Sequence, residues 1–514
     1  MTYASLRERF SWQIPTRFNM GVACSDVHPA DAPGLTAVDP AGAVTHYTFG
    51  ELAGRSDRLA QGLRDRGIER GDRVAVVAPQ SLETALTHLA VWKLGAVSLP
   101  LASLFGPDAL AYRLTDSAAG LAIASPDNVE KIREAAPTLP VVTIGKDFDE
   151  LAAAPRLPAA VDTAADDPAY LIYTSGTTGP PKGALHAHRS LFGHLPGFEC
   201  YYEFPPQTDD LIWTPADWAW IGGLMDVLIP AWYFGMPVLT AAHDFEPEWA
   251  VDLMAERRVT LAFIPPTALK MMRAAGAGRT DLKLRAIFTG GEALGEEVLA
   301  WSIEALGCGI NEGYGQTEAN LVVGNCGPVW PVRPGSMGRS LPGHEVAIFD
   351  DNGDRLIGEI GEICVRSPDP VMMLEYWNQP EATAEKYRDG WLLTGDLGME
   401  DEDGYLWFRS RKDDVIMSRG YRIGPGEIEE SLMTHPAVAM CAVVGFPDEL
   451  RGEVPAAFVV LRSGQIPGSD LAADLQAHVR RRLAAHEVPQ QVTFIDELPR
   501  TTTGKIMRRA LRGE

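Results

Sequence analysis

Small hydroxyl residues and glycines are concentrated in one short segment, YTSGTTGPPKG, at Tyr173–Gly183. Glycine leaves backbone N–H groups accessible, and the hydroxyls of Ser175, Thr177 and Thr178 can donate too, so the segment suits anionic oxygens such as those of phosphate. Lys182 adds a point charge for the same oxygens. The spacing departs from the Walker pattern GxxxxGK[ST], and a flexible linker is the alternative interpretation. The strand-like run AYLIYTSG that leads into the segment favours a phosphate-binding loop.

Five other segments contain an acid, a hydroxyl or a lysine within a compact motif. Taken singly, each has an ordinary explanation: exposed glutamates such as Glu318 and exposed lysines such as Lys505 are common. A functional interpretation rests on the occurrence of all these segments in one chain. The segments are TGGEAL (Thr289–Leu294), YGQTE (Tyr314–Glu318), WLLTGDLG (Trp391–Gly398), RSRKDDVIMSRGYRIGPGEIE (Arg409–Glu429) and LPRTTTGKIMRR (Leu498–Arg509).

Alternating helices and strands are expected to position these segments. In the first third, helical spacing at residues 49–67 and 81–95 alternates with apolar runs at 72–79 and 96–101. The same rhythm returns in the middle, where apolar runs at 260–266 and 284–291 precede a helix at 292–307. This alternation predicts parallel sheets covered by helices. Ligands of such folds bind at the carboxyl ends of the strands, where FTGGE and NEGYGQTE lie.

The alternation of helical and strand-like segments ends after about Val332. Short strands separated by turn pairs such as Asn352-Gly353 predict a small β-barrel or twisted sheet at 330–411. Helix and strand alternate again from 412 to 514, which predicts a separate domain. The expected fold class is therefore α/β: a large N-terminal domain, residues 1–411, of helix-covered parallel sheets with the small barrel, followed by a small mobile α+β domain, residues 412–514.

Composition narrows the class of protein. The chain has 514 residues and a formal net charge of −24, which argues against nonspecific binding of nucleic acid or anionic membranes. Its six cysteines are scattered without a CxxC pair, so reduced thiols in a cytoplasmic protein are expected. The apolar stretch at residues 222–242 contains Asp226 and two prolines, which favours a buried helix-turn-strand over a membrane span.

Together, and in this order, the six motifs resemble those of the adenylate-forming (AMP-binding) superfamily, which includes acyl-CoA synthetases, firefly luciferase-like enzymes and the adenylation domains of peptide synthetases. The spellings are most similar to the short/medium-chain CoA ligase branch. The resemblance implies an ATP-dependent acyl-CoA synthetase that uses Mg²⁺ and coenzyme A. It would join a carboxylic acid to AMP with release of pyrophosphate, and then transfer the acyl group to the thiol of CoA.

The same resemblance implies roles for individual residues. Lys182, Thr317 and Lys505 would be catalytic, with Lys505 bridging the carboxylate substrate and the α-phosphate, and Glu318 would hold Mg²⁺. Asp396 and Arg411 would grip the ribose hydroxyls. The implied nucleotide-binding set is Thr174, Ser175, Gly176, Thr177, Thr178, Gly179, Gly291, Glu292, Ala293, Glu312, Gly313, Tyr314, Gly315, Gln316, Thr317, Asp396 and Arg411.

Domain movement and the thiol route are also implied by the resemblance. Asp413 matches the position about which the C-terminal domain of relatives rotates between the two half-reactions. Gly420 and Arg422 would then line the route of the thiol arm, and Arg480 is the best match for a contact to the CoA 3′-phosphate. Relatives commonly form dimers, so a homodimer is compatible with this sequence.

Two positions bear on the acid. Trp220 falls where related synthetases carry an aromatic residue of the acyl pocket. Gly315 stands where acetyl-specific relatives carry a tryptophan, so we expect an acid larger than acetate, of short or medium chain length or aryl. Two alternatives remain: an adenylation enzyme that loads a carrier protein, and a nucleotide-binding protein without turnover. An intact set of charged residues argues against the second alternative: Lys182, Glu318, Asp396, Arg411 and Lys505.

Overall fold

The computed structural model describes residues 1–174, 180–292, 294–418, 421–448, 452–500 and 506–513. The chain divides into two compact units. The first consists of the described residues of Met1–Gly176, Pro180–Val346 and Val365–Leu392, and the second of those of Ala347–Cys364 and Leu393–Glu514. The domain border predicted between residues 411 and 412 falls inside the second unit. As a statement about a moving domain, that border stays a prediction.

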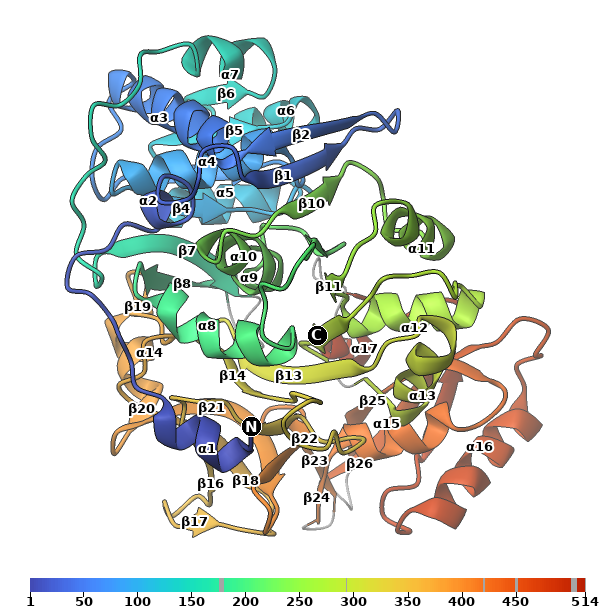
Figure 1. Ribbon diagram of the computed structural model, residues 1–514. Coiled ribbons are helices and arrows are strands. Elements are labelled where there is room, and N and C mark those ends of the chain that lie inside the picture. The colour runs from blue at the N-terminus through green and yellow to red at the C-terminus, as the bar shows by residue number, and fades with distance from the viewer. Residues whose placement is uncertain (175–179, 293, 419–420, 449–451, 501–505, 514) are drawn as a thin grey trace. The chain divides into compact units, whose positions relative to one another are not determined.

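One sheet of the first unit carries the predicted phosphate loop. Its strands are paired in the order β19-β8-β7-β4-β3-β5-β6 (Figure 1). The pairs from β7 to β6 are parallel, while β8 and β19 are antiparallel to their neighbours. The bounds are β3 Arg73–Val77, β4 Val97–Pro100, β5 Leu121–Ala124, β6 Val141–Thr143, β7 Pro168–Thr174, β8 Lys182–Ala187 and β19 Glu375–Tyr376.

Helices cover this sheet, as the alternating pattern predicted (Figure 1). Consecutive residues of β3, from Val74 to Val77, are all buried, because helices lie on both faces of a parallel sheet. The helix predicted at 49–67 begins with a capping box, in which Thr48 and Glu51 each hydrogen-bond the other's backbone N–H. The covering helices are α3 Phe49–Asp65, α4 Leu82–Lys93, α5 Pro107–Asp116 and α6 Pro126–Ala135.

The other sheet of the first unit carries TGGEAL and YGQTE. Its strands are paired in the order β15-β14-β13-β12-β11-β9-β10-β1-β2, and those from β13 to β1 are parallel. The bounds are β1 Pro33–Val38, β2 Val44–Thr48, β9 Ile212–Trp213, β10 Val238–Ala241, β11 Leu261–Phe263, β12 Ala286–Gly290, β13 Ile310–Gln316, β14 Ala319–Gly324 and β15 Gly338–Ser340.

Three helices, α11 (Pro247–Glu256), α12 (Pro266–Ala275) and α13 (Glu296–Ala305), pack against this sheet around a common apolar core. The helix predicted at 292–307 was placed too early. It begins only at Glu296, because Gly295 adopts φ +94°, a left-handed conformation that the first turn of a helix cannot continue through.

The apolar stretch at residues 222–242 is confirmed as buried helix and strand. It forms α9 (Ile221–Gly223), the π-helix η1 (Leu224–Leu228), α10 (Ile229–Tyr233) and β10. No helix in the described ranges is long and apolar enough to cross a membrane. All six cysteines are buried and none of them forms a disulfide, in line with the expected reduced thiols.

The second unit contains the strands predicted after Val332. They pair in the order β17-β16-β18-β21-β22, which is a sheet path rather than a closed barrel among the described strands. A further sheet, β24-β23-β26-β25 with β27 beside β26, packs with helices around its own core. The bounds are β16 Val346–Phe349, β17 Arg355–Leu356, β18 Gly361–Arg366, β21 Trp391–Glu400, β22 Tyr405–Arg411, β23 Ile416–Ser418, β24 Tyr421–Ile423, α15 Pro425–Met433, β25 Val438–Asp448, β26 Gly452–Leu461, α16 Ser469–Arg482, β27 Gln491–Phe494 and α17 Arg508–Arg512.

Candidate functional site

The predicted phosphate loop leaves β7 and returns on β8 at neighbouring points. Thr174 and Lys182 are register partners, and the Thr174 hydroxyl donates to the Lys182 carbonyl over 3.3 Å. The Lys182 ammonium lies 5.1 Å from the ring centroid of Tyr376 on β19. Such a cation–π contact positions the charge without neutralising it. The remaining loop residues of the nucleotide-binding set, Ser175, Gly176, Thr177, Thr178 and Gly179, lie outside the described residues.

Glu318 is a buried carboxylate, 8% exposed, that follows β13. The Tyr376 hydroxyl donates to its Oε1, and the Met373 N–H donates to its carbonyl oxygen over 2.9 Å. Among the described residues no hydrogen bond reaches Oε2, so that oxygen is available to a ligand. The described residues contain no group of three or more potential metal ligands. A single carboxylate suits Mg²⁺ that is also bound by substrate phosphates and water, so Glu318 fits the predicted role.

The motifs TGGEAL and EGYGQTE lie side by side at the carboxyl ends of β12 and β13. Gly290 is the register partner of Gly313, and Thr289 that of Glu312. This confirms the expected gathering of both motifs at one sheet edge. After β12, Gly291 has φ +93° and Glu292 accepts a hydrogen bond from Thr267 over 2.7 Å. Ala293 lies outside the described residues.

The Glu312 side chain has the most unusual electrostatics of this edge. It is 9% exposed, and burial raises its pKa from 4.5 to about 7. The charge of Lys270 and the N–H of Leu294 act in the opposite direction, but they do not offset the loss of hydration. A carboxyl group that titrates near neutrality at the end of a parallel strand is typical of a functional site.

Gly315 lies where β13 and β14 approach very closely. A Cβ atom on Gly315 would stand 2.4 Å from the backbone N of Leu321 and 2.8 Å from the Cα of Asn320. The register of the two strands shifts between Tyr314 and Gln316. Glycine is therefore required by the backbone itself. The role of Gly315 in the acyl pocket stays a prediction.

Two further candidates of the first unit have identifiable neighbours. Gln316 accepts a hydrogen bond from Lys386 over 3.2 Å, a partner that no sequence motif indicated. Trp220 is half-buried, and its ring meets Phe105 edge-on at 5.8 Å between centroids. Trp213, Trp218 and Trp232 are buried core residues.

The predicted ribose-binding pair lies within the second unit. Asp396 on β21 and Arg411 on β22 are register partners, and Arg411 Nη1 donates to Asp396 Oδ1 over 2.8 Å. Asp396 is 5% exposed, so the ion pair has a fixed, largely desolvated carboxylate. Arg411 Nε also approaches Asp413 Oδ1 at 3.4 Å. The sequence therefore identified two side chains that the fold places together.

Charged residues around the predicted hinge form a network that sequence reasoning missed. Lys412 contacts Asp351 at 3.1 Å and Glu362 at 3.2 Å. Asp414 contacts Arg508 and Arg512, each at 3.4 Å. These partners are far away along the chain, and no local spacing could have indicated them.

The predicted C-terminal contacts are described only in part. Gly420 and Lys505 lie outside the described residues, and of Arg422 only the backbone, in β24, is described. Arg480 is exposed in the last turn of α16.

His186 and His188, next to the phosphate loop, are fully buried, and burial lowers their pKa values to about 3 and about 4. They therefore act as neutral core residues.

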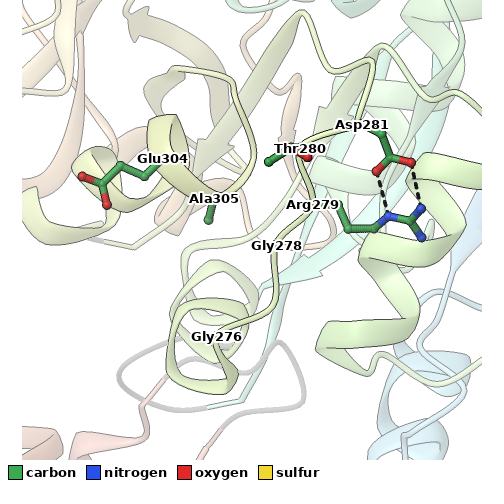
Figure 2. A pocket seen from close by; sticks show the side chains of 7 residues that line it. All are labelled: Gly276, Gly278, Arg279, Thr280, Asp281, Glu304 and Ala305. Atoms are coloured by element: carbon green, nitrogen blue, oxygen red, sulfur yellow. Dashed lines mark hydrogen bonds and ion pairs between the residues drawn. The ribbon is translucent and has the colours of Figure 1, made fainter.

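A surface hollow of about 510 Å³ lies apart from all these motifs (Figure 2). Figure 2 shows Arg279 and Asp281 joined by hydrogen bonds at its edge, at 2.9 and 2.8 Å. Arg279 and Asp281 are already paired with each other, and no predicted site residue lines the hollow. The lining residues are Gly276, Gly278, Arg279, Thr280, Asp281, Glu304 and Ala305.

Comparison with known proteins decides the family. Residues 26–377 match the model of the AMP-binding enzyme family, and residues 427–505 match that of the AMP-binding enzyme C-terminal domain. The chain belongs to this family. The family member described here is accordingly an AMP-forming acid–thiol ligase of the acyl-CoA synthetase group.

Individual relatives agree over almost the whole chain. An uncharacterised acyl-CoA ligase of Bacillus subtilis, YtcI, is 32% identical over 92% of this chain and 91% of its own. The mitochondrial acyl-coenzyme A synthetase ACSM4 of Homo sapiens is 35% identical over 94% of this chain and 86% of its own. ATP-bound MatB from Rhodopseudomonas palustris has a TM-score of 0.85 at 30% identity, covering 96% of this chain and 98% of its own.

Proposed function

We propose that this AMP-binding enzyme activates a carboxylic acid as its acyl-AMP, with release of pyrophosphate from ATP, and then transfers the acyl group to the thiol of coenzyme A, releasing AMP. One observation carries the proposal. Among the described residues, the Glu318 carboxylate accepts a hydrogen bond from Tyr376 at one oxygen and none at the other, and the Lys182 ammonium lies 5.1 Å from the centroid of the same tyrosine ring without an ion pair. This arrangement suits a nucleotide triphosphate and its metal.

Each residue of the candidate site has a proposed role that suits its side-chain chemistry. Lys182, Thr174 and the loop between them bind the phosphates of ATP, while Thr317 contacts the α-phosphate. Glu318 would hold Mg²⁺, which supplies positive charge next to the phosphate oxygens. Asp396 is an acceptor for the two ribose hydroxyls, and Arg411 fixes its position over 2.8 Å. Lys505 supplies charge in the transition state of adenylation.

The second half-reaction rests on the predicted hinge. We propose that Asp413 is the pivot of residues 412–514, and that Gly420, Arg422 and Arg480 contact coenzyme A. We also propose an acid larger than acetate. Acetyl-specific relatives carry a tryptophan at the position of Gly315, where it closes the acyl pocket. A tryptophan here would require the backbone of β14 to move, because its Cβ would stand 2.4 Å from Leu321 N.

The test is a screen for AMP release with ATP, CoA and a panel of carboxylic acids. Release of AMP that requires both an acid and CoA supports the proposal. Acid-dependent pyrophosphate exchange without any CoA thioester would instead favour loading of a carrier protein. ATP binding without AMP release for any acid would refute turnover.

A further inference from the structure

Asp226 is a buried carboxyl group in the π-helix η1, with 4% of its surface exposed. Its Oδ1 accepts a hydrogen bond from Asn320 Nδ2 over 2.6 Å. In the part of the chain that the structure describes, no ion pair reaches Asp226, and no hydrogen bond reaches its Oδ2. Burial raises the pKa of this carboxyl well above its usual range, and Asn320 opposes the shift only in part. Such a group costs free energy unless something pairs with it.

Among the described residues, no neighbour of Asp226 supplies a compensating charge. The groups that interact with it are the phenols of Tyr170, Tyr201 and Tyr202, on β7 and in α8 (Ser190–Tyr201) and directly after it. The Tyr202 hydroxyl donates to the backbone carbonyl of Asp226 over 3.2 Å and not to its carboxyl. If the pair only tied η1 to β14, two apolar side chains of similar size would do so at little cost. The open oxygen therefore suits a donor brought by a ligand.

The pair also lies between the two segments to which the sequence assigns the acyl pocket. A Cβ on Gly222, two residues after Trp220, would lie 3.6 Å from Asp226 Oδ2. On the other side, a Cβ on Gly315 would lie 2.8 Å from the Cα of Asn320. The Asp226–Asn320 pair thus lies next to both segments that are expected to contribute to the acid-binding pocket.

The backbone at this position is unusual in two independent ways. Leu321, next to Asn320, is buried with φ +51°, a left-handed conformation that is costly for leucine. Asp226 itself lies in a π-helical turn, and such turns are frequent at functional sites. The π-helical turn orients the Asp226 side chain, and the left-handed backbone at Leu321 affects the orientation of the neighbouring Asn320.

We propose that the Asp226–Asn320 pair forms the far end of the acid-binding pocket and selects carboxylic acids that carry a hydroxyl or amino group remote from the reacting carboxylate. The remote group donates a hydrogen bond to Asp226 Oδ2. A methyl group in its place leaves that oxygen desolvated and unpaired, which is how a polar site rejects an apolar analogue. This inference rests on the proposed function and adds the substrate class to it.

The experiment compares acids of equal size that differ only at the far end. The pairs are 4-hydroxybenzoate or 4-aminobenzoate against 4-methylbenzoate, and 5-hydroxypentanoate or 5-aminopentanoate against hexanoate. The kcat/KM for AMP release is measured with each acid. In at least one series the wild-type enzyme should favour a donor-bearing acid by about tenfold or more. The hydroxyl and amino arms show which of the two donors is used.

Two variants and one control connect the preference to the pair. The double variant Asp226→Val/Asn320→Leu should lower the donor-to-methyl ratio to about one or below, while the methyl-bearing acids are still activated. Asp226→Asn keeps the size of the side chain. It should reduce the donor-to-methyl ratio more for the amino-bearing acids than for the hydroxyl-bearing acids. The control is Asp369→Asn, another buried aspartate, which hydrogen-bonds His344 over 2.7 Å. It should leave every ratio unchanged.

The outcomes separate this inference from the proposed function. The inference would be overturned if the wild-type enzyme gave donor-to-methyl ratios near one for all pairs, or if both Asp226 variants left the ratios unchanged. In either case, AMP release with the same acids would still uphold the proposed function. No AMP release with any acid would overturn both.

Discussion

Replacing Glu312 by glutamine should change the stability of the protein in a way that depends on pH. The folded protein raises the pKa of Glu312 from 4.5 to about 7 by burial. The folded state therefore binds this proton more tightly than the unfolded chain does. The contribution of the group to stability is fully present below pH 4.5 and is lost as the pH rises through about 7.

The size of the effect follows from the difference between the two pKa values. One pKa unit corresponds to about 1.4 kcal/mol. The free energy of unfolding therefore falls by about 3 kcal/mol as the pH rises from 4.5 to above about 7. Glutamine does not titrate. Glu312→Gln should therefore match the wild type near pH 5 and exceed its stability at pH 8, by roughly 6 °C in Tm at about 2 °C per kcal/mol.

The assay is thermal unfolding of both proteins from pH 5 to pH 8.5, and the quantity to compare is the difference between their Tm values at each pH. Exposed Glu304→Gln, in α13 beside the same sheet, serves as the control and should show no trend. A difference between Glu312→Gln and wild type that stays constant across the range would refute the reasoning, because a buried ionising group cannot give a pH-independent effect.

Three further substitutions test the proposed mechanism. Lys505→Ala should abolish acyl-AMP formation but largely spare thioester formation from supplied acyl-AMP; equal loss in both steps would contradict the role in adenylation. Asp413→Pro should do the opposite, because proline fixes φ and restricts the preceding residue, and rapid-quench measurement of both steps checks this. Gly315→Ala should lower the Tm through a Cβ placed 2.4 Å from Leu321 N, whereas Gly309→Ala, with no atom within 4 Å of the new Cβ, should not. The overpacking at Gly315 should cost about 1–3 kcal/mol, and equal Tm values for these two variants would contradict it.

The sequence predicted those parts of the fold that depend on local pattern. The helix at α3 and the strand at β3 follow from apolar spacing and capping, and α13 was misplaced only where Gly295 delays its start. Asp396 and Arg411 were singled out by the family resemblance and not by local pattern, and the fold makes them register partners on β21 and β22.

What could not be predicted depends on pairing over long stretches of chain. Tyr376 comes from the short strand β19, which pairs with β8, and only that pairing brings its hydroxyl to Glu318. Asp226 and Asn320 meet because η1 packs next to β14, and their types and spacing give no sign of it. The burial that shifts the pKa of Glu312 is likewise a property of the assembled sheet.

The position of Tyr376 explains how two opposite charges can stay ready for different ligands. If the Lys182 ammonium met the Glu318 carboxylate directly, each would neutralise the other and a bound phosphate or metal would first have to break the ion pair. In the described residues Lys182 forms no ion pair, and its charge lies over the ring of Tyr376 while the hydroxyl of that ring holds Glu318. The aromatic side chain thus separates the charges and positions both. A phosphate chain can approach the cation and a hard metal ion the open carboxylate oxygen, so neither binding step has to pay the cost of breaking an existing salt bridge.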